Sequence, residues 1–420
     1  MHILFVHKNF PAQFGHIAGY LIKQKGYRCS FVSETAPGMV GGIQKIQYKP
    51  AGGAVEQTLY YARTFDNAVG HAAGIYQALK PLVTRLRPDL IVGHSGFGST
   101  LFLPELFPGT PVINYFEYFY YAHNSDMDFR PEWPVLEDDV LRSRARNAMI
   151  LLDLEYCQAG YSPTEFQASL MPSAYRDKLR VLHDGIDTDF WRRRPPAQRT
   201  VGRHTFGPDT RLVTYVSRGF ESMRGFDVFM RAAKKIYTAN PNVVFLIVGS
   251  DRVAYGGDLK FIQEKTFREH VLKHDQYDPQ RLLFLGPVPP AELARLFSLS
   301  DLHIYLTVPF VLSWSLLDAL ACGCTVLASD TAPVREFIRD GQTGLLRNFF
   351  DVDGLAEAAL KVLEDPQAYR HLGRAGEALI RERYSLATII PRLTEFYEEV
   401  ADGRVGRTSG RNAAGSPEAA

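Results

Sequence analysis

Short apolar runs alternate with longer amphipathic stretches along the first half of the chain. The run His2 to Val6 leads into a helical pattern from about Ala12 to Lys25, and Arg28 to Ser33 forms the next apolar run. We also expect long amphipathic helices from Tyr60 to Arg87 and from Val135 to Leu154. Strand-length runs separated by helical stretches are typical of βαβ units, which build parallel sheets.

The same alternation starts again in the second half. Leu212 to Val216 is apolar, Gly225 to Ala239 follows as a helix, and Val243 to Val248 is the next strand. The segment between the two series, from Asp184 to Thr200, is rich in turn-forming residues and arginine, and we interpret it as a hinge. The pattern therefore predicts an α/β protein with two doubly wound parallel sheets that face each other across a cleft.

Polar residues stand at the carboxyl ends of two predicted strands in the first half. His94 follows the strand Leu90 to Val92, and Glu117 follows the strand Val112 to Tyr115. Open parallel sheets bind their ligands at that edge, so both side chains are candidates for a site. A polar residue at the rim of the sheet is the alternative interpretation of each.

Composition narrows the class of protein. The chain has 420 residues, enough for two domains, and a hydrophobic fraction of 46%, which is ordinary for a folded protein. Its net charge is +1, from 47 Lys and Arg against 46 Asp and Glu, so no bulk field draws it to nucleic acid. Two arginine clusters are interpreted as solvated surface, with attraction to lipid headgroups as the alternative: Arg142, Arg144 and Arg146, and Arg192 to Arg194.

The cysteines show no spacing typical of a metal site or a disulfide framework; they are Cys29, Cys157, Cys322 and Cys324. Met1 to Val6 is interpreted as a buried strand rather than a leader, and no window is apolar over the length of a membrane span. We expect a cytoplasmic protein, with peripheral contact at the inner face of a membrane left open.

Two stretches of the second half have the chemistry of an anion site. The first, Ser217 to Gly225, follows an apolar strand, opens a helix and contains Arg218 and Arg224. Free backbone N–H groups at a helix start, together with two guanidinium groups, suit a diphosphate. A surface turn with solvated arginines fits these residues equally well.

The second stretch, Thr307 to Gly323, is a serine-containing loop that leads into a helix. Its first acid is Asp318, one turn into that helix, where a carboxylate could accept both hydroxyls of a ribose. The alternative is a capped, buried helix in which Asp318 faces solvent and binds nothing.

Three further motifs follow in order: Cys322 to Asp330, Pro333 to Glu336 and Asp340 to Leu346. Together with the two preceding stretches they resemble glycosyltransferase family 4, the retaining nucleotide-sugar transferases with a GT-B fold. The resemblance implies two Rossmann-like domains, an acceptor-side domain over residues 1–190 and a nucleotide-sugar-binding domain over 201–385. We expect a terminal helix, 386–402, to pack back toward the first domain, and the tail 403–420, rich in Gly, Ser, Ala, Arg and Asn, to be disordered.

The resemblance also implies roles by position in the second domain. Arg218 matches the arginine that holds the donor diphosphate, Arg224 stands where a lysine is usual, and Asp318 matches the acid that binds the ribose. The other acid of the family lies eight positions upstream, where this chain has Phe310. The donor-binding candidates are completed by the residues that replace a glycine-rich loop: Ser313, Trp314 and Ser315.

In the first domain the resemblance places the loop after the first strand against the donor. Gly15 in this loop is the candidate for close approach of the backbone to the donor, with packing at a helix start as the alternative. Glu117 stands where a histidine is common, and we group it with Arg218 and Arg224 as the catalytic candidates.

An aromatic run follows Tyr115 and leads to His123. Tyr118 and His123, together with His94, are the candidates for contact with the acceptor or for lining the cleft. A position partly in the core is the alternative for such a run.

These matches imply transfer of a sugar, with retention, from a nucleoside diphosphate sugar to a glycan, a lipid-linked or a small-molecule acceptor. No metal and no cofactor is expected; UDP-sugars are the first expected donors and GDP-sugars the second. The second hypothesis is a catalytically weak GT-B protein that acts as a nucleotide-sugar-binding partner subunit, and Phe310 motivates it. Oligomeric state does not follow from the sequence.

Overall fold

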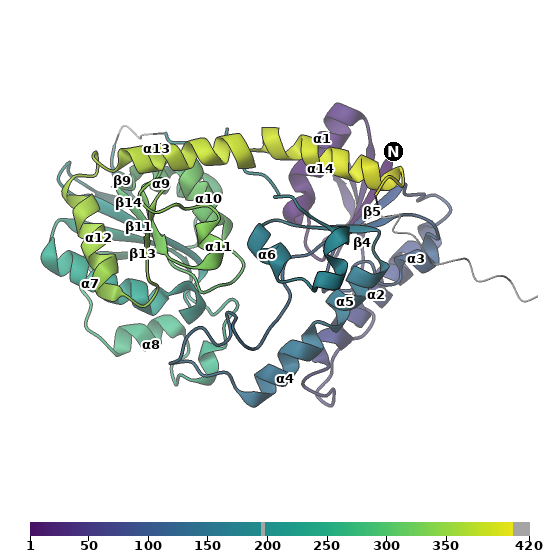
Figure 1. Cartoon of the computed structure of the whole chain (residues 1–420), viewed down its shortest axis with the longest axis horizontal. Helices are drawn as coiled ribbons and strands as arrows, with labels where there is room; N and C mark the ends of the chain where they lie inside the picture. Colours follow the sequence, from purple (N-terminus) through teal and green to yellow (C-terminus); the bar gives the residue numbers. More distant parts are fainter. Residues whose placement is uncertain (195–197, 406–420) are drawn as a thin grey trace, which may run out of the picture.

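The computed structural model describes residues 1–194 and 198–405, which form two halves, each with its own sheet (Figure 1). The first sheet has eight strands in the order β3-β4-β2-β1-β5-β6-β7-β8, all parallel except the β3/β4 pair. Its strands are β1 (His2–Val6), β2 (Arg28–Ser33), β3 (Gly38–Val40), β4 (Ile43–Gln47), β5 (Leu90–His94), β6 (Val112–Tyr115), β7 (Ala159–Ser162) and β8 (Leu179–Val181).

The second sheet has six parallel strands in the order β13-β12-β11-β14-β15-β16. They are β11 (Arg211–Gly219), β12 (Val243–Ser250), β13 (Leu282–Gly286), β14 (Leu302–Tyr305), β15 (Val326–Ser329) and β16 (Leu345–Arg347); β9 (Thr200–Val201) and β10 (His204–Thr205) form a small ribbon. Strand order reverses between β1 and β5 in the first sheet and between β11 and β14 in the second. Such reversals are the places where open parallel sheets bind ligands.

Helices cover both sheets, so the central strands are buried on both faces. Those of the first half are α1 (Gly15–Lys25), α2 (Arg63–Leu79), α3 (Leu103–Leu106), α4 (Glu137–Arg146), α5 (Ala148–Tyr156) and α6 (Glu165–Ser169). The second half contributes α7 (Phe226–Ala239), α8 (Phe267–Lys273), α9 (Pro290–Leu299), α10 (Trp314–Ala321), α11 (Ala332–Arg335), α12 (Val352–Glu364) and α13 (Arg370–Leu379), and α14 (Leu386–Ala401) comes last. Short turns complete the set: η1 (Ala12–Phe14), η2 (Lys80–Leu82), η3 (Ser173–Lys178), η4 (Ser222–Arg224), η5 (Asp258–Lys260) and the π-helical η6 (Ile380–Tyr384).

The predicted fold class is confirmed by these two doubly wound sheets, but some predicted elements were wrong. The helix predicted from Val135 to Leu154 is two helices, α4 and α5, that meet at Asn147. The Asn147 side chain accepts a hydrogen bond from the N–H of Tyr120 (2.9 Å) and donates one to its carbonyl (2.8 Å). The helix predicted from Tyr60 to Arg87 is shorter, and the β3/β4 hairpin and β16 were not predicted.

Helix α14 returns from the second half to the first and packs against α1 (Figure 1). The hydroxyls of Tyr397 and Tyr161 lie 3.0 Å apart, and Lys25 forms an ion pair with Glu398 at 3.0 Å. The last 15 residues of the tail predicted to be disordered, 406–420, lie outside the described residues. Among the residues that are described, no helix is both long enough and apolar enough to cross a membrane.

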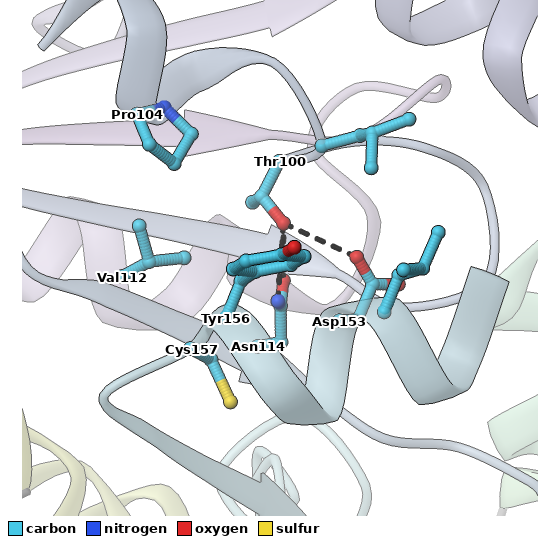
Figure 2. A pocket seen from close by; sticks show the side chains of 9 residues that line it. Thr100, Pro104, Val112, Asn114, Asp153, Tyr156 and Cys157 are labelled. Carbon is cyan, nitrogen blue, oxygen red and sulfur yellow. Dashed lines mark hydrogen bonds between the residues drawn. The ribbon is translucent and has the colours of Figure 1, made fainter. Parts of the chain in front are cut away.

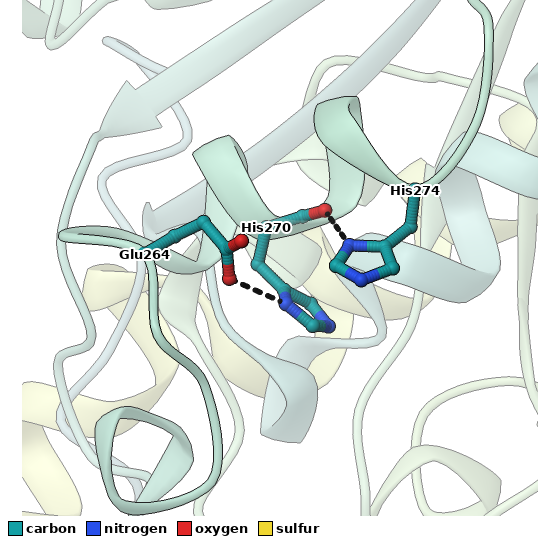
Figure 3. Close-up of side chains that lie close together, drawn as sticks. All are labelled: Glu264, His270 and His274. Carbon is teal, nitrogen blue, oxygen red and sulfur yellow. Dashed lines mark hydrogen bonds and ion pairs between the residues drawn. The ribbon is translucent and has the colours of Figure 1, made fainter.

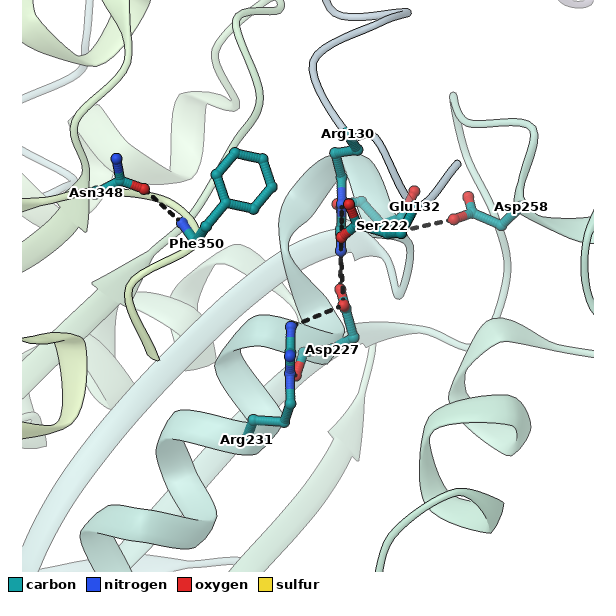
Figure 4. A network of polar contacts seen from close by, with 8 residues as sticks. All are labelled: Arg130, Glu132, Ser222, Asp227, Arg231, Asp258, Asn348 and Phe350. Atoms are coloured by element: carbon teal, nitrogen blue, oxygen red, sulfur yellow. Dashed lines mark hydrogen bonds and ion pairs between the residues drawn. The ribbon is translucent and has the colours of Figure 1, made fainter. Parts of the chain in front are cut away.

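A segment of the first half, residues 116–135, lies against the second half; we call it the crossing segment. Arg130 of this segment is buried and forms two hydrogen bonds with the Asp227 carboxylate, at 2.8 and 2.7 Å, on α7 (Figure 4). It also donates to the carbonyl of Ser222 (2.8 Å) and pairs with Glu132. The two halves are thus joined by a buried ionic network as well as by the chain itself.

Candidate active site

Arg218 lies near the carboxyl end of β11, at the edge of the sheet that faces the first half. Its side chain is exposed, and its guanidinium donates a hydrogen bond to the hydroxyl of Tyr255 (3.1 Å). That hydrogen bond raises the pKa of Arg218 further. Arg218 therefore presents a permanent positive charge to solvent at this edge.

Arg224 ends the short turn η4 and is buried. Its guanidinium donates to the hydroxyl of Thr307 (2.8 Å) and to the carbonyl of Val311 (2.9 Å). It also lies over two aromatic rings, 5.3 Å from the centre of Tyr255 and 5.8 Å from that of Phe310. Arg224 thus holds the loop before α10 in place, a structural role that its sequence position did not predict.

Phe310 occupies the position at which the resemblance leads one to expect an acid. Only 8% of it is exposed, because its ring packs against Tyr118 at 4.7 Å and Tyr255 at 5.5 Å between ring centres. Tyr118 belongs to the crossing segment, so this aromatic contact joins the two halves. The hydroxyl of Tyr118 donates to Asp126 (2.7 Å), and the carbonyl of Pro309 lies 3.4 Å from it.

Glu117 follows β6 at the carboxyl edge of the first sheet. Its side chain is 46% exposed, yet the surrounding protein raises its pKa by desolvation, and the nearby charges of Arg218 and Arg224 partly lower it. The charges of both arginines thus act on the pKa of Glu117, although no direct contact joins Glu117 to either of them among the described residues.

His94 ends β5, and its Nε2 lies 3.8 Å from a carboxyl oxygen of Glu117. Burial lowers the pKa of His94 to about 4, so the imidazole is neutral at pH 7 and forms no ion pair. Its Nδ1 lies 2.9 Å from the carbonyl of Ser95, which can only accept, so the proton is on Nδ1. His94 and Glu117 therefore both present acceptors suited to sugar hydroxyls.

The loop before α10 contains the remaining donor-binding candidates. The hydroxyls of Ser313 and Ser315 lie 2.9 Å apart, and the N–H of Ser313 donates to the hydroxyl of Tyr305 (2.9 Å). Trp314 begins α10 and is 43% exposed. These contacts keep the two serines together at the start of the helix.

Asp318 lies one turn into α10 and is nearly buried rather than facing solvent. Its carboxyl group has no hydrogen-bond partner among the described residues, and burial raises its pKa well above the usual range. The carboxyl oxygens are not among the fully buried polar atoms without a partner, so they keep some exposure. Carboxyl groups with a raised pKa in such places concentrate at binding sites. This is the arrangement expected if a ligand supplies the missing donors.

Two candidates have other surroundings. Gly15 starts α1 in an ordinary helical conformation, and a side chain there would meet the ring of Pro11 at 2.9 Å, so packing accounts for the glycine. The side chain of His123 is 72% exposed and lies 4.0 Å from Asp128. Within the described part of the chain, no contact joins His123 to His94 or Glu117. Roles for Gly15 and His123 stay predictions.

Tyr255 and Glu221 were missed by the sequence reasoning. Tyr255 lies in the loop after β12, at the same edge as Arg218, and contacts both arginines and Phe310. Glu221 is fully buried, and one of its carboxyl oxygens accepts hydrogen bonds from the N–H groups of Ala254 (2.9 Å), Tyr255 (2.8 Å) and Gly256 (3.0 Å). The place of Tyr255 after a predicted strand was the only signal available.

A small cavity lies elsewhere, between β6 and α5 (Figure 2). Its volume is about 10 Å³, room for about one water molecule. Thr100 donates to Asn114 (3.2 Å) and lies 3.4 Å from Asp153 at its wall. This cavity is too small to bind a substrate.

Solved structures support the fold. The chain superposes on sucrose-phosphate synthase from Thermosynechococcus elongatus with a TM-score of 0.72 at 17% identity, over 96% of this chain and 99% of the other. The Anabaena protein HepE, solved in complex with UDP-glucose, gives a TM-score of 0.66 at 14% identity, over 95% and 100%. At these identities the likeness shows a shared fold.

Curated relatives match over shorter spans. A phosphatidyl-myo-inositol mannosyltransferase of Mycolicibacterium smegmatis is 30% identical over 46% of each chain. An N-acetyl-alpha-D-glucosaminyl L-malate synthase of Bacillus anthracis is 29% identical over 30% of this chain and 33% of its own length. The chain thus spans about a third to a half of the length of these relatives.

Family models cover the chain in two successive parts. Residues 25–191 match the model described as "Glycosyl transferase family 4 group", and residues 199–379 match the model described as "Glycosyl transferases group 1". The junction between the matches falls in the segment that we interpret as a hinge. Because the two models together match most of the chain, it belongs to the group 1 glycosyltransferases of family 4.

Proposed function

We propose that this protein transfers a sugar from a nucleoside diphosphate sugar to an acceptor bound against the first half. The observation that carries the proposal is the contact between the two halves at the candidate active site, where Tyr118 packs on Phe310 and Arg224 lies over the same ring. The charges of Arg218 and Arg224 also lower the pKa of Glu117 on the first half. The unpartnered carboxyl group of Asp318, one turn into α10, supplies the acceptor that a ribose needs.

Arg218 is the group that would stabilise the leaving diphosphate. It is the exposed member of the arginine pair, and phosphate oxygens suit its forked donors. Arg224 would act mainly by fixing the loop of Thr307 and Val311, since two of its donors are already used. Charge that develops on the diphosphate during transfer is the main electrostatic demand of this reaction.

We further propose that the reaction retains the anomeric configuration and needs no metal. The two arginines can neutralise diphosphate charge that a divalent cation would otherwise neutralise. His94 and Glu117, as neighbouring acceptors, would bind hydroxyls of the transferred sugar. The chain also resembles a family of retaining transferases, and this resemblance favours retention.

UDP-sugars are the first proposed donors and GDP-sugars the second. HepE, solved with UDP-glucose, favours the former, and a relative named a GDP-mannose-dependent mannosyltransferase, 26% identical over 56% of this chain, favours the latter. The acceptor is proposed to be a glycan, a lipid-linked or a small-molecule alcohol. A cytoplasmic location with peripheral membrane contact stays a prediction.

Release of nucleoside diphosphate from a panel of UDP-, GDP- and ADP-sugars tests the proposal, with pooled acceptors present. At least one donor should be turned over, and Arg218→Ala should reduce the rate about 10²-fold. Arg281→Ala is the matched control, because Arg281 precedes β13 at the opposite edge of the sheet and should leave the rate unchanged. Donor binding without turnover would instead support the partner-subunit hypothesis.

A further inference from the structure

Two histidines lie side by side at the end of α8, and no contact joins them to the candidate active-site residues within the described part of the chain. His270 and His274 are four positions apart, so they share one face of the helix. Their ring centres are 4.2 Å apart. Glu264, in the loop before the helix, completes a group whose ligand atoms all lie within 4.8 Å of one another (Figure 3).

The hydrogen bonds of both rings determine which nitrogen carries the proton. The Nδ1 of His270 lies 2.9 Å from a carboxyl oxygen of Glu264, and the Nδ1 of His274 lies 2.7 Å from the carbonyl of His270. The carboxylate of Glu264 and the backbone carbonyl of His270 both accept hydrogen bonds. Each Nδ1 must therefore be a donor, which leaves the two Nε2 lone pairs free and next to each other (Figure 3).

We propose that His270 and His274 bind one divalent transition-metal ion such as Zn²⁺ through their Nε2 atoms, with Glu264 orienting His270 from behind. Imidazole nitrogen is a preferred ligand of Zn²⁺, at about 2.0–2.1 Å. A carboxylate on the other ring nitrogen is the usual outer-shell partner of such a histidine. The negative end of the α8 dipole, beside His274, also favours a cation. Water completes the coordination.

The position of the site suggests its effect. Trp133 of the crossing segment packs on α8, with its ring centre 6.2 Å from that of His270 and 5.7 Å from that of Phe267. An ion that cross-links the end of α8 would stiffen the surface on which the crossing segment rests. Binding to the folded state alone also raises its stability by mass action.

Calorimetric titration of the untagged, chelator-stripped protein with Zn²⁺ tests the proposal. The parent should bind one equivalent, the His270→Gln/His274→Gln double variant should show no binding, and Glu264→Ala should bind about 10- to 100-fold more weakly. His371→Gln is the matched control: His371 is exposed on α13 and makes the same Nδ1-to-carbonyl contact, 2.7 Å, with Ala368, but it is not part of the cluster. No heat with the parent, or equal binding by the double variant, would overturn the site.

Trp133 gives a second, independent readout. Cu²⁺ bound at His270 should quench the fluorescence of this nearby tryptophan, and Trp133→Phe should remove most of the quenching while calorimetric Zn²⁺ binding persists. The chain has only two other tryptophans. Quenching that survives fully in Trp133→Phe would put the ion elsewhere and overturn the proposal. Because no active-site residue is involved, this failure would be distinct from a failure of the transferase assignment.

Discussion

At the scale of single residues, Tyr255 connects the parts of the candidate site. Its hydroxyl accepts from Arg218, while its ring packs on Phe310 and under Arg224. Tyr255→Phe keeps the packing but removes a hydrogen bond to a charged group, so kcat/KM for the donor should fall about tenfold or more. In Tyr255→Ala the kcat/KM for the donor should fall further, because the packing is lost as well. Steady-state kinetics decides, and parental kinetics for both variants would contradict the role of Tyr255.

Burial of Asp318 raises the pKa of its carboxyl group, so folding favours the protonated, neutral form. Asp318→Asn keeps the shape of the side chain and removes a buried ionisable group, so the melting temperature should be kept or raised. Its affinity for the nucleoside diphosphate should nevertheless fall about tenfold, since the amide replaces one of the two acceptor oxygens with an NH2 donor. Thermal melts and calorimetric titration measure the two effects separately. Unchanged affinity would refute the contact between Asp318 and ribose.

At the scale of elements, Asp153 ties α5 to the loop after β5. It accepts hydrogen bonds from Ser95 (2.9 Å) and from the N–H of Gly96 (2.8 Å), and burial raises its pKa from 3.8 to about 6. Between about pH 4 and 6 the folded protein therefore holds a proton that the unfolded chain has released. The free energy of unfolding should fall as pH rises through this window, by up to about 3 kcal/mol.

Asp153→Asn tests this account of the pH dependence. The amide is neutral at every pH, so the variant should gain stability over the parent at pH 7.5 and gain less at pH 5. Urea unfolding at the two pH values measures the difference, with Asp177→Asn, an exposed aspartate in η3, as the control. A variant that is less stable than the parent at pH 7.5 would show that the hydrogen bonds outweigh the buried charge.

Alternating apolar runs were sufficient to predict the central strands of both sheets and the positions of Arg218, Glu117 and His94 at their edges, because strand ends follow from local pattern. The edge strands β3, β4 and β16 were missed. The break at Asn147 was not predictable, since it depends on hydrogen bonds to Tyr120, 27 residues away. Nor could sequence reveal that Phe310 packs on Tyr118, 192 positions earlier. Both features depend on contacts between residues far apart in the sequence, which the local pattern of apolar and polar residues does not contain.

At the scale of the whole molecule, Arg130 joins the two halves. Arg130→Met would leave the Asp227 carboxylate only its longer contact with Arg231, at 3.5 Å, at an expected cost of about 3 kcal/mol. Scanning calorimetry should then resolve two transitions in place of one, and Arg130→Lys, which keeps the charge without the fork, should lie between parent and variant. A single transition at the parental temperature would contradict this role.

Helix α14 has a consequence for biosynthesis. The core of the first half includes side chains of this helix, among them Ile389, Leu393, Phe396 and Val400. That core therefore cannot close before α14 has been made, by which time every strand of the second half has been made as well. Domains generally fold in the order of their synthesis, whereas here the core of the earlier half needs a helix that is made after the later half. The part of the protein that is translated first is the last to be completed.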